Sequence, residues 1–434
     1  MTVMPASFSP DSETRVDALP NGVRVVTVRM PWLDSAAVTV FVRTGSRDEG
    51  VRQAGISHVV EHMAFKGTAT RSGDRVNLDA ERLGAEVNAH TDKDHTAYHM
   101  RGLAAHAGDF VHMLADIVRD GTYPADELER ERQVILHEFT EDDEDPLSNA
   151  FRMFDAACFG AHPMARPVIG LKRNIERFTR DELLAYVGQR YGACNVVVGV
   201  AGAIDPDAMV REVEAAFGSM PAGTPTVSAP PAWHGGIRTR RLAGCSQSHM
   251  VIGWPVPTLR DDCEPAIVAA ALLGEGMSSP LMQQIREKRG LVYYAACSAD
   301  VWDQCGQFVI EASTSPKQVD EVATTVERLM REQRDATAKV DFERARNQIA
   351  VRRGRSQEAP FRRLEEAAQD LYVHGRLRSR ADMAARLADV TPRQVRHAFE
   401  QMMAWPAAVA VAGSVAAGTR DRLHVLFPQP GDRP

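Results

Sequence analysis

The sequence lacks any C-x-x-C pair, which argues against a zinc site built from thiolates. Its six cysteines are irregularly spaced, at Cys158, Cys194, Cys245, Cys263, Cys297 and Cys305. In a chain of 434 residues, this pattern favours free thiols in a reducing compartment over a disulfide framework. We therefore expect a cytoplasmic protein.

Long apolar runs and an excess of basic residues are also missing. No run approaches the length of a membrane span, and residues 1–15 lack the basic and then apolar pattern of a signal peptide. Lys and Arg number 51 against 58 Asp and Glu, so the formal net charge is −7. Nucleic-acid binding requires a basic footprint, so we expect no nucleic-acid partner. An acidic balance would suit a chamber that attracts basic peptides, but ordinary solubility explains it better.

The chain is too long for one ordinary core, and its composition suggests where it divides. Residues 219–236 are dense in Pro, Gly, Ser and Thr, a composition that resists both helix and strand. We interpret this stretch as a linker between an N-terminal domain, residues 1–218, and a C-terminal domain, residues 237–434.

The two halves resemble each other. Residues 195–205 and 406–416 are both apolar strands closed by a glycine turn, and residues 126–133 resemble residues 341–348. The partners are offset by similar amounts, 406 − 195 = 211 and 341 − 126 = 215 residues. We infer a duplicated domain, the alternative being chance similarity between two α/β segments.

Hydrophobic periodicity in the first half alternates between strand and helix patterns. The predicted elements are strands at residues 22–29, 36–44, 85–90 and 96–100, with helices at residues 55–65, 105–119 and 124–142. Strands followed by helices within each half predict an α+β fold. We expect two homologous α/β sandwich domains, each an antiparallel-rich sheet packed with helices.

The sharpest chemical signal is the sequence His58-Val-Val-Glu61-His62. Helix positions four apart share a face, so both imidazoles could reach one metal ion. Glu61 is three residues from His58 and falls on the same side, while the apolar residues among 56–64 fall on the opposite side. Two histidines and a glutamate on a solvated helix face would give the same pattern, so the proposal needs a third ligand.

The helix predicted over residues 124–142 is the place to look for that ligand. One face of it carries Leu128, Glu131, Val134, Ile135 and Glu138. Two carboxylates on an apolar stripe are notable, because a buried acid is costly unless it is paired or binds a metal. Ion pairing with Arg130, Arg132 or His137 would account for one of them. Spacing alone does not choose between Glu131 and Glu138.

Four segments together resemble those of the pitrilysin and insulinase family, which includes the mitochondrial processing peptidases. They are the H-x-x-E-H-M-A-F-K-G-T segment of residues 58–68, E-R-Q-V-I-L-H-E of residues 131–138, N-A-H-T of residues 88–91 and H-P-M-A-R-P-V-I-G of residues 162–170. The reversed order of the histidine motif is that of the inverted zincins.

This resemblance implies one zinc ion per chain, with His58, His62 and Glu138 as its ligands. Glu131 would support the site without binding the metal itself. Glu61 would act as the general base that takes a proton from the attacking water.

The resemblance also places Asn88 and Ala89 at a strand edge, where the substrate backbone would add as an extra strand. Three further histidines lie nearby, at His90, His95 and His99. Their spacing on a strand or turn favours satisfied or exposed histidines over metal ligands.

The second half has no H-x-x-E-H sequence, but it contains Arg286 and Tyr293, seven residues apart. The resemblance identifies them as the family's arginine–tyrosine pair, which contacts the substrate backbone and the transition-state oxygen. Spacing alone favours a surface basic helix end followed by a core tyrosine. Tyr294 follows directly, so the phase of this strand could be misassigned by one residue.

In long family members four such domains form a clam-shell chamber, of which this chain would supply half. The resemblance therefore implies a homodimer, or a heterodimer with a related chain, that hydrolyses peptides as a zinc-dependent endopeptidase. The alternative is a non-catalytic structural or partner subunit of the same family. An unrelated α/β binding protein is disfavoured by the duplicated halves. The arginine–tyrosine pair would act either in cis, within one chain, or in trans, across two chains.

Overall fold

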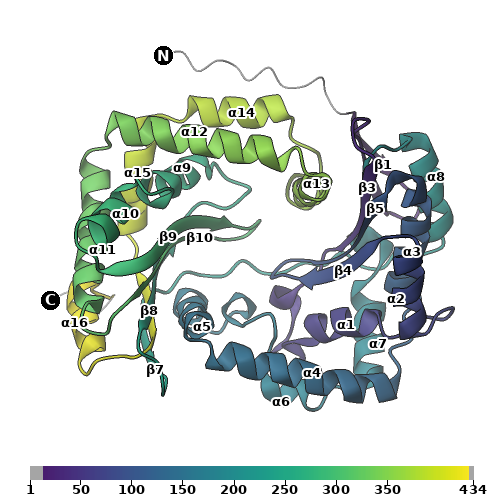
Figure 1. Cartoon of the computed structure of the whole chain (residues 1–434), viewed down its shortest axis with the longest axis horizontal. Coiled ribbons are helices and arrows are strands. Elements are labelled where there is room, and N and C mark those ends of the chain that lie inside the picture. Colours follow the sequence, from purple (N-terminus) through teal and green to yellow (C-terminus); the bar gives the residue numbers. More distant parts are fainter. Residues whose placement is uncertain (1–12, 430–434) are drawn as a thin grey trace. The chain divides into compact units, whose positions relative to one another are not determined.

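The computed structural model describes residues 13–429, which form two sheets and their covering helices (Figure 1). The prediction that the chain has no signal peptide rests on residues 1–15, of which 1–12 lie outside the described part. Between residues 13 and 429, every helix is too short or too polar to cross a lipid bilayer. All six cysteines fall in this part, and each is a free thiol.

The first sheet is mixed, and its central strands are rich in valine. Its order is β1 (Thr14–Ala18), β2 (Arg24–Arg29), β6 (Val196–Gly202), β3 (Ser35–Val42), β5 (Thr96–Leu103) and β4 (Glu86–Thr91). Every residue of β6 is buried, as expected for a β-branched central strand covered on both faces. Strand β4 pairs with β5 and lies at the edge of the sheet, so one side of its backbone is available for pairing.

The second sheet repeats the topology of the first. Its order is β7 (Gly236–Arg241), β11 (Ala408–Gly413), β8 (Ser248–Pro255), β10 (Gly306–Thr314) and β9 (Val292–Val301). Apart from β1, the strands of the first sheet correspond one to one to those of the second. In each sheet one pairing is parallel, β2 with β6 and β7 with β11, and the other pairings are antiparallel. This shared topology accounts for the similar strands at residues 195–205 and 406–416, and it confirms two α/β domains of an α+β fold.

The helices complete two compact units, each containing one sheet. The unit around the first sheet contains α1 (Ile56–Ala64), α2 (Gly73–Arg82), α3 (Ala107–Arg119), α6 (Lys172–Ile175), α7 (Arg180–Arg190), α8 (Pro206–Phe217), α13 (Pro360–His374) and the first turns of α4 (Ala125–Glu144). The unit around the second sheet contains α5 (Pro146–Phe159), α9 (Glu264–Gly274), α10 (Pro280–Met282), α11 (Val319–Asp335), most of α12 (Lys339–Ser356), α14 (Arg380–Asp389), α15 (Pro392–Met403) and α16 (Thr419–Leu426).

Each unit includes one sheet-covering helix from the other half of the sequence. Helix α13 covers one face of the first sheet, opposite α3 and α8 (Figure 1), and its Leu364 packs over Gly199 of β6. Helix α5 likewise covers the second sheet, with Phe154 over Gly253 of β8. A Cβ at Gly199 would lie 2.8 Å from Leu364, and one at Gly253 would lie 2.6 Å from Phe154, so both close contacts require glycine. The boundaries 1–218, 219–236 and 237–434 stay a prediction.

Candidate metal centre

The helix that carries the histidine motif is anchored at its N-terminus by a buried carboxylate. The backbone N–H groups of Gly55 and Ser57 donate to the two oxygens of Glu49, at 2.7 and 2.8 Å. Gly55 has a φ of 102°, and a Cβ there would lie 2.7 Å from the carbonyl oxygen of Ile169. A negative charge at a helix N-terminus satisfies free N–H groups and complements the helix dipole. The start of α1 is thereby fixed before its first histidine.

Helix α1 separates apolar from functional residues, as its sequence pattern predicted. Its apolar residues are buried, namely Ile56, Val59, Val60, Met63 and Ala64. His58, Glu61 and His62 are partly exposed on the other side. One face is therefore held by packing while the other presents two imidazoles and a carboxylate.

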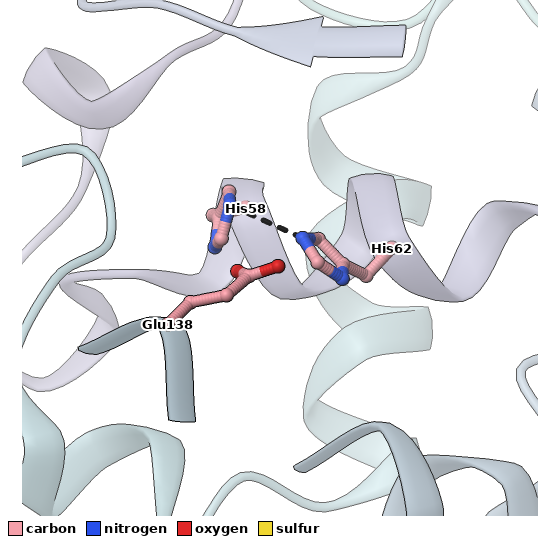
Figure 2. Close-up of side chains that lie close together, drawn as sticks. All are labelled: His58, His62 and Glu138. Atoms are coloured by element: carbon pink, nitrogen blue, oxygen red, sulfur yellow. Dashed lines mark hydrogen bonds between the residues drawn. The ribbon is translucent and has the colours of Figure 1, made fainter. Parts of the chain in front are cut away.

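Three of the predicted side chains come together at this face (Figure 2). Nε2 of His58 lies 3.2 Å from Nε2 of His62, and one carboxylate oxygen of Glu138 completes a group whose ligand atoms are all within 4.8 Å of one another. Two nitrogen ligands of a tetrahedral zinc ion, each about 2.05 Å from the metal, lie about 3.3 Å apart. The separation of the two imidazole nitrogens therefore fits a shared ion.

Glu138 reaches this group because α4 is one continuous helix from Ala125 to Glu144. Glu131 lies two turns earlier on the same helix and is buried. The predicted apolar stripe is narrower than expected, since Val134 is 47% exposed. Arg132 is buried instead, donating to the backbone carbonyls of Ile175, the last residue of α6, and of Phe178, which lies between α6 and α7.

Glu131 connects the histidine motif to Lys66, a residue that the motif itself does not include. Its Oε1 lies 2.9 Å from Nδ1 of His62, and its Oε2 lies 2.6 Å from Nζ of Lys66. A carboxylate on Nδ1 fixes the tautomer that leaves the Nε2 lone pair directed at a metal. Lys66 lies in the turn just after α1 and is four residues after His62, a spacing that could have revealed it.

The electrostatics keep His58 and Glu131 in the protonation states that a metal centre requires. Burial, with a contribution from the charge of His62, lowers the pKa of His58 from 6.5 to about 3, so its imidazole is neutral at neutral pH. Burial raises the pKa of Glu131, but hydrogen bonds from His62 and Lys66 outweigh it and leave the pKa below its ordinary value of 4.5. Zinc binds imidazole nitrogens and carboxylate oxygens, so the donor types of this group and the spacing of its imidazoles fit this ion.

Glu61 contacts the edge strand of the first sheet. Thr91, the last residue of β4, donates from Oγ1 to Oε2 of Glu61 at 2.8 Å. Asn88 and Ala89 lie on the same edge strand, where Asn88 is exposed and its side chain accepts from the N–H of Ala89 at 2.8 Å. The structure thus places the residues predicted to bind substrate on a strand whose end contacts the predicted base. Their roles stay predictions.

Arg286 and Tyr293 contact each other within the second unit. The guanidinium carbon of Arg286 lies 5.6 Å from the centre of the Tyr293 ring, and Tyr293 is 83% exposed. Tyr294 instead donates its hydroxyl to Glu311 at 2.8 Å, so the arginine is paired with the first of the two tyrosines. The alternative of a core tyrosine at position 293 is wrong, whereas contact with substrate stays a prediction.

Replacing Lys66 with methionine is expected to weaken zinc binding by about tenfold, the lower end of the range for outer-shell partners. The contact between ionised Glu131 and His62 is present above pH 4.5 and is lost as pH falls through the depressed pKa of Glu131. Without Lys66 this pKa rises, so affinity should fall at a higher pH than in the unmodified chain. Competition with a chelating dye between pH 4 and 7 measures this, with exposed Lys172→Met as control; equal pH profiles would contradict the role.

An inverted histidine motif on a helix, completed by a glutamate from a second helix, is the ligand arrangement of the inverted-zincin class of metallopeptidases. Residues 24–172 match the family model "Insulinase (Peptidase family M16)", and residues 177–349 match "Peptidase M16 inactive domain". An uncharacterized zinc protease of Mycobacterium leprae is 36% identical over 318 residues, covering 72% of each chain. One of Streptomyces coelicolor is 30% identical over 426 residues, covering 94% of this chain and 92% of the relative.

The chain belongs to the pitrilysin and insulinase family, peptidase family M16. A crystal structure described as the peptidase M16 inactive domain from Pseudomonas fluorescens has the same fold, with a TM-score of 0.85 at 20% identity over 93% of this chain and 98% of that one. The chain is thus a member of a zinc protease family, and the model described as the inactive domain matches residues 177–349, which contain no H-x-x-E-H sequence.

Proposed function

We propose that the protein is a zinc-dependent endopeptidase that hydrolyses peptides or unfolded segments. The observation that carries this proposal is the 3.2 Å separation of the imidazole nitrogens of His58 and His62, with an oxygen of Glu138 beside them. The two histidines lie on α1, the helix that also presents Glu61. Bound zinc would supply a Lewis acid and would bring the pKa of a coordinated water toward neutrality. Each of the three ligand side chains and the base comes from a helix rather than a loop, which favours a fixed geometry.

In this proposal the protein's own groups move the protons. Glu61 takes a proton from the attacking water and returns it to the leaving amine. The hydrogen bond from Thr91 fixes the rotamer of Glu61, and Glu131 holds His62 in the correct tautomer. The substrate backbone would pair with the free edge of β4 beside Asn88 and Ala89, which brings its carbonyl toward α1.

A peptide library is the direct test of the activity. The zinc-loaded chain should generate new termini within the peptides, detected by mass spectrometry, whereas the Glu61→Gln chain should not. Internal cleavage distinguishes an endopeptidase from an enzyme that trims ends. An intact library with tightly bound zinc would instead favour the alternative, a non-catalytic subunit of the same family.

We further propose that two chains form the working enzyme, with the arginine–tyrosine pair of one acting at the zinc centre of the other. The 83% exposure of the Tyr293 side chain supports a role in contact with another molecule. A His58→Ala chain should have no activity, and a Tyr293→Phe chain should have little. A mixture that forms mixed dimers should recover up to about a quarter of the unmodified activity, since half the dimers are mixed and each retains one complete site.

Mixed dimers should be verified by two affinity tags before activity is measured. Mixing His58→Ala with Glu61→Gln provides the matched control, because both changes lie in the same element and no combination restores an intact helix α1. Verified mixed dimers without recovered activity would contradict action in trans and support action in cis.

A further inference from the structure

A second pair of histidines lies at the turn between β4 and β5, outside the proposed catalytic group. His90 is on β4, and His95 ends the four-residue turn that precedes β5. Their Nε2 atoms are 3.3 Å apart, and their rings are nearly perpendicular, with centres 5.4 Å apart. Two nitrogen ligands of a tetrahedral zinc ion lie about 3.3 Å apart. This pair thus has the separation that two imidazoles take on one ion.

The pair also has the carboxylate partner that metal-binding histidines use. Nδ1 of His95 lies 2.7 Å from Oδ1 of Asp94. This contact directs the proton of His95 to Nδ1 and leaves the lone pair on Nε2, the atom that faces His90. Glu131 makes the same contact with Nδ1 of His62 at the family's metal centre. The two histidine pairs therefore share both their spacing and their orientation by a carboxylate.

The turn that carries His95 is held in place by backbone contacts with residues 45–47. The N–H of Ser46 donates to the carbonyl of Asp92 at 3.1 Å, and the N–H of Arg47 donates to the carbonyl of Lys93 at 2.9 Å. A Cβ at Gly45 would lie 2.3 Å from the Asp92 carbonyl oxygen, so the close approach requires glycine. A turn fixed in this way keeps the imidazoles in position before any ion binds.

Further carboxylates lie close to the pair. Ligand atoms of Asp92, Asp94 and His95 are all within 4.8 Å of one another. The charges of Asp92 and Glu365, the latter on α13 in the same unit, act on both imidazoles, whereas His95 and Arg362 oppose them at His90. Glu365 is itself paired with Arg362 at 2.8 Å. The carboxylates of Asp92 and Asp94 beside His95 favour a cation at this turn, and Asp92 or Glu365 would have to turn toward His90 to supply a third ligand.

We propose that His90 and His95 hold a second metal ion of the kind that imidazole ligands favour, such as zinc, and that Asp94 orients His95. A carboxylate of Asp92 or Glu365 and water would complete the coordination. Imidazole nitrogens select zinc, copper, nickel or cobalt over magnesium or calcium, which prefer oxygen ligands. With two histidines at a partly exposed turn, this ion should bind less tightly than the one at His58, His62 and Glu138.

The position of the pair gives this ion a structural connection to the family's metal centre. Successive residues of a strand point to opposite faces. His90 is opposite Ala97, which packs in the core under α13, whereas Thr91 on the other face donates to Glu61 of α1. An ion on His90 would therefore restrain the end of the edge strand whose next residue contacts Glu61. Only this connection to hydrolysis rests on the proposed function; metal binding itself does not.

Metal stoichiometry tests the second site without an activity assay. Equilibrium dialysis against zinc, with metal content measured by mass spectrometry, should give two equivalents for the unmodified chain and one each for His90→Ala and His95→Ala. His58→Ala should also bind one, and His58→Ala combined with His90→Ala should bind none. His106→Ala is the matched control, because His106 also contacts a carboxylate, Asp109, at 3.2 Å, yet its aromatic neighbour is Phe110.

Circular dichroism should first show that each variant is folded, and His90→Asn provides a smaller change if His90→Ala is not. A single equivalent in the unmodified chain, or an unchanged second equivalent in His90→Ala, would overturn the proposal and leave the pair as an N–H···N hydrogen bond. Failure of the peptidase proposal is a separate outcome, since an inactive chain could still bind both ions.

Hydrogen exchange locates the second ion. In the His58→Ala chain, zinc should slow amide exchange in residues 86–99 by at least about threefold, and the additional change His90→Ala should abolish this protection. Protection spread evenly over the chain, or protection that persists without His90, would place the ion elsewhere and contradict the assignment.

Discussion

Glu61→Gln is expected to lower kcat/KM for peptide hydrolysis by about 10²- to 10⁴-fold, the usual contribution of a positioned general acid and base. Glutamine keeps the size of the side chain and can still contact Thr91, which donates to Oε2 of Glu61 in the unmodified chain. The amide cannot take a proton from water at neutral pH. Zinc affinity should change little, because Glu61 is not one of the three residues grouped as ligands. Initial rates on a fluorogenic peptide, with zinc titrated in parallel, measure both quantities.

Glu81→Gln is the matched control for this variant. Glu81 lies on α2 of the same unit and is exposed. Its replacement by glutamine therefore removes the same charge without touching the proposed site. If the Glu61→Gln chain were as active as the control, a residue other than Glu61 would be the general base. Loss of tightly bound zinc together with activity would show instead that Glu61 maintains the metal centre and would leave its catalytic role without support.

The parts of the site that are local in sequence could be predicted from spacing. Helix α1 begins and ends one residue inside the predicted range 55–65, because its apolar periodicity and the position of Gly55 define it. Positions 58 and 62 then share a face on geometry alone. The choice of Glu138 over Glu131 could not be made in this way, since both lie on the side of α4 that approaches α1. The family resemblance made the choice, and the structure places Glu138 in the ligand group.

Contacts between segments distant in sequence gave no such signal. The hydrogen bond between Thr91 and Glu61 depends on the register of β4, and a shift by one residue would direct Thr91 to the opposite face. The exchange of α5 and α13 was equally hidden, because an amphipathic pattern shows which face of a helix is buried but not which sheet buries it. Gly199 and Gly253 mark the contacts in retrospect, as a glycine inside a strand permits close approach of another chain segment.

His62→Ala is expected to abolish the tight zinc equivalent and reduce peptide hydrolysis to background. The change removes one of three protein ligands and also leaves buried Glu131 without the imidazole that it contacts at 2.9 Å. Glu131→Gln should behave differently: all three ligands remain, so zinc affinity should fall about 10- to 100-fold and excess zinc should restore activity. Zinc titrations followed by activity at saturation separate these two behaviours.

Stability offers a second readout of the same loss. Zinc at about 1,000 times its dissociation constant stabilises a protein by about 4.1 kcal/mol, so this increment should disappear from the unfolding free energy of the His62→Ala chain. His137→Ala is the control, because His137 precedes Glu138 on α4, is 75% exposed and contacts Glu141. Excess zinc should not restore the activity of His62→Ala, because it cannot supply the missing ligand. Rescue as complete as that of Glu131→Gln would contradict the assignment of His62 as a ligand.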